Sequence, residues 1–148
     1  GQRVLILGAG GASRGILLPL LEAGVSAIHI ANRTANKAQA LLDTLPASDL
    51  PLSASSLDDI PDTHYDIVIN ATSIGLSGEA LPFRRDLTAT YAYDMMYGKP
   101  SAFLDFFNQQ GATTSDGLGM LIHQGALSFA LWTDQAVDLI KLGNPFTA

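Results

Sequence analysis

A glycine-rich turn near the N-terminus is the first segment of this sequence that could do chemistry. Gly8, Gly10 and Ser13 occupy the three fixed positions of a G-x-G-x-x-G pattern, with Ser in place of the third glycine. Gly8 permits a tight turn, and Gly10 lets a pyrophosphate approach the backbone because it has no side chain. The N–H groups and dipole of the following helix would attract that anion. The pattern therefore predicts a dinucleotide site, and a merely tight turn is the alternative.

The same residues also fit a second enzyme class. Gly11, Ser13 and Gly15 spell G-x-S-x-G, the nucleophile elbow of an α/β-hydrolase, in which Ser13 would be the nucleophile. Its acid and base would have to come from distant residues such as Asp94 and His123. In an elbow the strand runs straight into the first glycine, whereas residues 8–10 intervene here. The hydrolase is therefore the remote alternative.

A second anion-binding segment follows residues 27–31, which we expect to form a strand. An acidic residue at the end of this strand would bind the NAD ribose and repel a 2′-phosphate, but this sequence has none there. It has Asn32, Arg33 and Thr34 instead, with Lys37 one turn further on. A guanidinium, an ammonium and two neutral hydrogen-bonding groups could surround a phosphate. This segment favours NADP over NAD, although by composition alone Arg33 would be a solvated surface charge.

Alternating strands and helices must position these segments. Apolar runs predict strands at residues 3–7, 27–31, 52–54, 66–70, 90–95 and 112–115. Helical spacing predicts helices at residues 12–23, after a cap at Thr34, and at residues 101–110, 118–132 and 134–142, with one helical turn at residues 57–60. This order predicts an α/β fold, a Rossmann-type doubly wound, mainly parallel sheet with helices on both faces.

Composition narrows the class of partner. The length of 148 residues fits one domain, and 47% hydrophobic residues suffice for a core. A formal net charge of -6 argues against nucleic-acid or anionic-membrane binding. The sequence has no cysteine and no apolar run of the roughly 18 residues that span a bilayer. We expect a soluble, cytoplasmic protein.

Five motifs in register, GAGGASRG, NRTANKA, INATSIG, YDMMYGK and DGLGML, resemble the NADP-binding domain of shikimate dehydrogenases. That family reduces 3-dehydroshikimate to shikimate with NADPH, in aromatic amino acid and chorismate biosynthesis. The alternatives are a quinate/shikimate dehydrogenase with relaxed cofactor use and a non-catalytic dinucleotide-binding module. A tetrahydrofolate or glutamyl-tRNA dehydrogenase shares the fold, but YDMMYGK argues against it.

The resemblance implies particular site residues. It places the pyrophosphate on Gly8, Ala9, Gly10, Gly11 and Ala12, and the 2′-phosphate among Asn32, Arg33, Thr34 and Lys37. It places Thr72 and Ser73 in the cofactor cleft, Met95 and Gly117 near the nicotinamide, and Tyr97 and Gln124 at the substrate. Without it, Met95 would be a core residue, Gly117 a turn, Tyr97 a rim aromatic and Gln124 a polar helix residue. No metal site is expected.

The resemblance also implies a missing half. The family's catalytic Lys and Asp belong to a preceding domain, and this sequence begins at Gly1, two residues before the first predicted strand. We therefore expect residues 1–148 to be an isolated NADP-binding domain that binds cofactor, has no catalytic residue of its own and is inactive alone. Apolar residues of the last helices, including Leu127, Phe129, Leu131 and Trp132, would cover the absent domain or form a homodimer.

Overall fold

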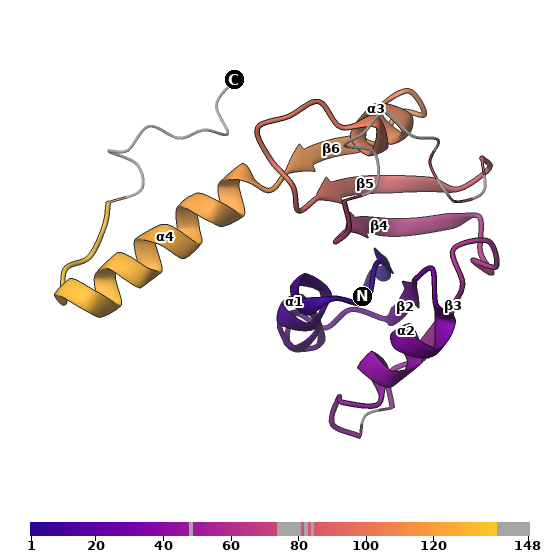
Figure 1. The fold of residues 1–148 in the computed structure, drawn as a ribbon, viewed down its shortest axis with the longest axis horizontal. Helices are drawn as coiled ribbons and strands as arrows, with labels where there is room; N and C mark the ends of the chain where they lie inside the picture. The colour runs from indigo at the N-terminus through magenta and orange to yellow at the C-terminus, as the bar shows by residue number, and fades with distance from the viewer. Residues whose placement is uncertain (48, 74–80, 82, 84, 139–148) are drawn as a thin grey trace.

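The computed structural model describes residues 1–47, 49–73, 81, 83 and 85–138 (Figure 1). The strands are β1 (Arg3–Leu7), β2 (Ala27–Ala31), β3 (Leu52–Ser55), β4 (His64–Asn70), β5 (Thr88–Asp94) and β6 (Thr113–Asp116). The helices are α1 (Gly11–Glu22), α2 (Ala35–Leu42), α3 (Ala102–Asn108) and α4 (Leu118–Thr133). All six strands are parallel, in the order β3-β2-β1-β4-β5-β6. The predicted doubly wound sheet is confirmed.

Strand β1 lies at the centre of the sheet. It pairs with β2 on one side and β4 on the other, and Val4, Leu5, Ile6 and Leu7 are all fully buried. A strand covered on both faces needs a continuous apolar run, which RVLIL supplies. Because the chain winds outward from β1 in opposite directions, the carboxyl ends of β1 and β4 flank the switch point where such sheets bind ligands.

Two apolar layers hold helices against opposite faces of the sheet. Leu17 of α1 and Ala38, Leu41 and Leu42 of α2 pack with Val4 and Ile6 on one face. Phe103 and Phe107 of α3 pack with Leu5, Leu7 and Val68 on the other. The two phenylalanine rings meet edge to face at 5.0 Å between centroids, a favourable aromatic geometry. The two layers fix the strand ends that carry the site.

A buried histidine ties the edge strand β3 to β2. His29 Nδ1 lies 2.7 Å from Ser53 Oγ, and His29 Nε2 lies 2.9 Å from Ser55 Oγ. Since Ser55 Oγ donates to the Ser56 carbonyl, Nε2–H must be the donor to Ser55 and Nδ1 the acceptor from Ser53. Burial lowers the pKa of His29, and the nearby Asp62 partly opposes that shift. Burial therefore favours the neutral imidazole, which is the form that these two hydrogen bonds require.

Three local features differ from the predictions, the cap of α2 only in part. Residues 57–60 form a turn, in which Asp59 N–H donates to Ser56 O at 3.4 Å, in place of a helical turn. Pro61 disfavours helical backbone at the preceding residue. Thr34 is the N-cap residue of α2, as predicted, but its side chain makes no capping hydrogen bond. The Thr34 carbonyl instead accepts from Asn32 Nδ2 and from Lys37 N–H.

The third difference concerns the end of α4, where a further helix was predicted at residues 134–142. The helix stops at Thr133 because Asp134 adopts a left-handed conformation with φ 56°, and residues 135–138 are not helical. Residues 139–142 of the predicted last helix lie outside the described residues. Figure 1 shows α4 projecting away from the sheet, and Gly119 is its one buried residue. Among the described residues, no helix is long and apolar enough to cross a membrane.

Candidate cofactor-binding site

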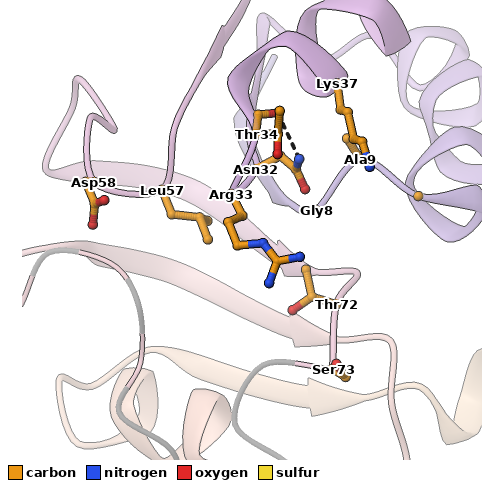
Figure 2. A pocket seen from close by; sticks show the side chains of 11 residues that line it. Gly8, Ala9, Asn32, Arg33, Thr34, Lys37, Leu57, Asp58, Thr72 and Ser73 are labelled. Carbon is orange, nitrogen blue, oxygen red and sulfur yellow. Dashed lines mark hydrogen bonds between the residues drawn. The ribbon is translucent and has the colours of Figure 1, made fainter.

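A pocket of about 590 Å³ opens at the carboxyl ends of β1, β2 and β4 (Figure 2). Its lining comes from the turn after β1, the segment after β2, the turn after β3 and the segment after β4. The lining residues are Gly8, Ala9, Gly10, Asn32, Arg33, Thr34, Lys37, Leu57, Asp58, Thr72 and Ser73. The pocket thus lies at the switch point of the sheet, where a dinucleotide is expected.

The first wall is the glycine turn. Gly8 has φ 103°, and a Cβ there would lie 2.6 Å from Thr72 Cγ2, so only glycine fits without strain. Gly10 precedes α1, and a Cβ on it would meet nothing within 4 Å, which leaves the backbone open to a ligand. The first N–H groups of a helix have no partner within that helix. The turn therefore presents an anion-binding helix terminus to the pocket.

Ser13 settles the choice between the two motifs that share this turn. Its side chain is fully buried, and Ser13 Oγ donates to the Gly8 carbonyl at 2.8 Å. A nucleophile elbow needs an exposed hydroxyl on the turn itself. The hydrolase interpretation of Ser13 is therefore wrong, and its hydroxyl instead closes the glycine turn.

The second wall carries the positive charge. Arg33 and Lys37 are both exposed, and within the described parts of the chain neither side chain forms a hydrogen bond or ion pair. Figure 2 shows Arg33 reaching from the end of β2 across the pocket toward Thr72. The described carboxylate on the pocket lining is Asp58, which follows β3 and lies on the other side of Leu57 from Arg33 in Figure 2. The end of β2 can therefore receive an anion.

The third wall follows β4. Thr72 donates to Asn70 Oδ1 through its backbone N–H at 3.1 Å and through Oγ1 at 2.6 Å. These bonds hold Thr72 beside Gly8 at the switch point. Ser73 follows as an exposed residue on the same rim.

Most of the residues expected to bind cofactor line this one pocket. Gly11 and Ala12 do not line it, but they are exposed at the start of α1, next to Gly10. Sequence reasoning missed Leu57 and Asp58, whose signal was only their position after the β3 strand.

Met95 and Gly117 lie together, but outside this pocket. Gly117 N–H donates to Met96 O at 3.0 Å, and a Cβ on Gly117 would lie 2.2 Å from Met95 O. Met95 also packs against the apolar layer of α1. Met95 is partly buried in this contact, so part of its side chain remains accessible.

The two expected substrate residues are accessible. Tyr97 is 44% exposed after β5, and Gln124 is exposed on α4. Neither lines the pocket. The neighbouring His123 points back to its own helix, where Nδ1 lies 2.8 Å from Gly119 O.

Comparison with known families identifies the fold and its relatives. Residues 1–77 match the family model described as shikimate / quinate 5-dehydrogenase, and residues 117–139 match the shikimate 5'-dehydrogenase C-terminal domain. The chain belongs to the shikimate/quinate 5-dehydrogenase family. The resemblance seen in the five sequence motifs is thereby confirmed.

Curated relatives and solved structures match nearly the whole chain. The shikimate dehydrogenase (NADP(+)) of Psychrobacter cryohalolentis is 51% identical over 95% of this chain and 50% of its own length. Among solved structures, an Ael1 enzyme from Pseudomonas putida is 42% identical with a TM-score of 0.85, over 95% of this chain and 53% of that one. Shikimate 5-dehydrogenase from Thermus thermophilus in complex with shikimate is 35% identical with a TM-score of 0.71, over 91% and 49%. The chain spans about half the length of the curated relatives it matches.

Proposed function

We propose that this chain is the NADP(H)-binding half of a shikimate dehydrogenase, which reduces 3-dehydroshikimate to shikimate in aromatic amino acid biosynthesis. The observation that carries the proposal is the pocket where the glycine turn faces Arg33 and Lys37, with no acid at the end of β2. An NAD-specific site would place a carboxylate there. The names of curated relatives, shikimate dehydrogenase (NADP(+)), agree with it.

The lining residues fit the parts of NADP in order along the pocket. The open backbone at Gly10 and the α1 terminus suit the pyrophosphate, contacted by Ala9, Gly11 and Ala12. Arg33 and Lys37 suit the 2′-phosphate, with Asn32 and Thr34 as neutral partners. Thr72 and Ser73 form the opposite wall, and the Met95–Gly117 contact marks the nicotinamide end.

NADPH supplies the hydride when it is bound, and the protein supplies binding and orientation. In this proposal Tyr97 and Gln124 donate hydrogen bonds to the hydroxy acid, since both groups bond without charge. The proton-transfer residues belong to the other half of the longer protein. Alignment of substrate and nicotinamide needs both halves, so the present chain binds cofactor without turnover.

The exposed apolar surface of α4 is consistent with a second domain that packs against it. Leu127, Leu131 and Trp132 are 68%, 85% and 84% exposed, an apolar face that an isolated monomer would not normally present. Curated relatives are about twice as long as this chain. We assign this face to packing against the substrate-binding domain, and a homodimer through α4 is the alternative.

Two measurements test the proposed function. Calorimetric titration of the 148-residue chain should show binding of NADP and weaker binding of NAD. NADP reduction, followed by NADPH absorbance with shikimate or quinate, should be absent for this chain and appear when the preceding domain is joined to it. Equal affinity for the two cofactors would contradict the 2′-phosphate site. Failure of the joined protein to turn over either acid would favour a non-catalytic dinucleotide-binding module.

A further inference from the structure

A buried polar pair lies beneath the cofactor pocket. Asn70 ends β4 and Asp94 ends β5, and the two are paired across the strands. Asn70 is 0% exposed and Asp94 is 1% exposed. Apolar residues at these positions would avoid the cost of removing an amide and a carboxyl group from water. The pair therefore has a use other than filling space.

The contacts of Asp94 fix the orientation of the Asn70 side-chain amide. Asp94 Oδ1 accepts from Asn70 Nδ2 at 3.2 Å and from Met96 N–H at 3.0 Å, while Oδ2 accepts from Ser101 Oγ at 2.5 Å. A carboxylate only accepts hydrogen bonds, so the NH₂ of Asn70 must face it. The amide oxygen of Asn70 must then point the other way, toward Thr72.

Thr72 is the side chain that this orientation controls. Both its backbone N–H and its Oγ1 donate to Asn70 Oδ1, which sets the rotamer of Thr72. That rotamer turns Cγ2 toward Gly8, where a Cβ would lie only 2.6 Å away. The amide of Asn70 thereby sets which atoms of the Thr72 side chain point toward the glycine turn and the pocket.

We propose that Asn70, held by Asp94, is a positioning residue for the cofactor: it fixes Thr72 against the glycine turn so that the wall facing the pyrophosphate is preorganised. The inference rests on the proposed NADP site. The same carboxylate holds Met96 N–H, at the start of the segment that carries Tyr97. Asp94 thus joins the cofactor wall to the proposed substrate edge.

Asn70→Ala tests the positioning role, with Ser101→Ala as the matched control. Ser101 bonds the other oxygen of Asp94 and caps α3 through Leu104 N–H at 3.2 Å, but it forms no hydrogen bond with Thr72. Both variants should lower stability. Asn70→Ala should weaken NADP binding roughly five- to tenfold, the worth of about one hydrogen bond. It should leave adenosine 2′-phosphate binding unchanged, because that ligand lacks the pyrophosphate. Ser101→Ala should change neither affinity.

Exchanging the two side chains, Asn70→Asp with Asp94→Asn, tests the same inference without the cavity that Asn70→Ala leaves. Asn70→Asp alone sets two carboxylates side by side and should destabilise the fold. Adding Asp94→Asn restores a donor between the two positions and an acceptor for Thr72, but the new NH₂ group then faces Met96 N–H, which Asp94 Oδ1 accepts in the wild type. The double variant should therefore bind NADP more tightly than Asn70→Asp alone, without reaching wild-type affinity.

The outcomes separate the inference from the proposed function. Unchanged NADP affinity in Asn70→Ala, equal losses in Asn70→Ala and Ser101→Ala, or no recovery in the double variant would overturn the positioning role. A wild-type chain that binds neither ligand would contradict the NADP site instead. Even then the Thr72 amide proton resonance tests the hydrogen bond, because it should move in Asn70→Ala and stay in Ser101→Ala.

Discussion

Arg33→Ala gives the sharpest test of cofactor choice. The guanidinium lies in the pocket and is exposed, and within the described residues it bonds no other protein group. Removing it should therefore leave the free energy of unfolding unchanged. A lost charge-assisted hydrogen bond is worth roughly 1.5 to 3 kcal/mol. Because solvent screens an exposed charge, we expect the lower half of this range, about a ten- to fortyfold loss in NADP affinity.

The assay is calorimetric titration with NADP and with NAD at one fixed ionic strength. NAD affinity should stay within about twofold, because NAD has no 2′-phosphate for Arg33 to bind. A twofold change in affinity corresponds to less than about half a kilocalorie per mole. Arg33→Lys is the matched control: it keeps the charge but loses the planar fork, so its NADP affinity should fall between the wild type and Arg33→Ala. The NADP loss should shrink as salt rises. Equal losses for NADP and NAD would refute the assignment of Arg33 to the 2′-phosphate.

Three further changes have defined outcomes. Gly8→Ala should lower the free energy of unfolding by about 1–3 kcal/mol in urea titrations and weaken NADP binding, because φ 103° and the contact with Thr72 both exclude a Cβ; a variant of wild-type stability would show that a Cβ is tolerated at this turn. Gln124→Ala, in the protein rejoined to its other half, should raise the KM for shikimate while the Kd for NADP stays constant; an unchanged KM would remove Gln124 from the substrate site. His29, whose pKa burial lowers, stays neutral in the fold but takes up a proton on unfolding below about pH 6.5. Stability should therefore fall as pH drops through that value, less so in His29→Gln, and equal pH slopes would show that His29 does not contribute.

The parts of the fold that the sequence predicted are those governed by local pattern. RVLIL predicted a strand covered on both faces, and Gly8 and Gly10 predicted the turn that follows it. Arg33 was found because its place follows directly from the end of a strand. In each case a few consecutive residues contain the whole signal.

The parts that were missed depend on contacts between distant segments. Leu57 and Asp58 reach the pocket only because β3 pairs beside β2, which no local pattern specifies. The bond between Asn70 and Asp94 requires the register of β4 against β5. Ser13 matched two motifs, and although the residues between strand and elbow made the hydrolase remote, only the burial of Ser13 and its bond to Gly8 excluded it.

The contact between Gly117 and Met95 means that a small tilt at the base of α4 displaces its far end by several ångströms. Backbone meets backbone at the base of the helix, with no room for a side chain on Gly117, so a Cβ there would have to shift the start of α4. Sixteen residues at about 1.5 Å each make an arm of roughly 24 Å. A tilt of about 10° at its base would carry Trp132 about 4 Å, given that arm. A substitution at Gly117 would thus leave the phosphate pocket intact and displace whatever α4 holds at its far end.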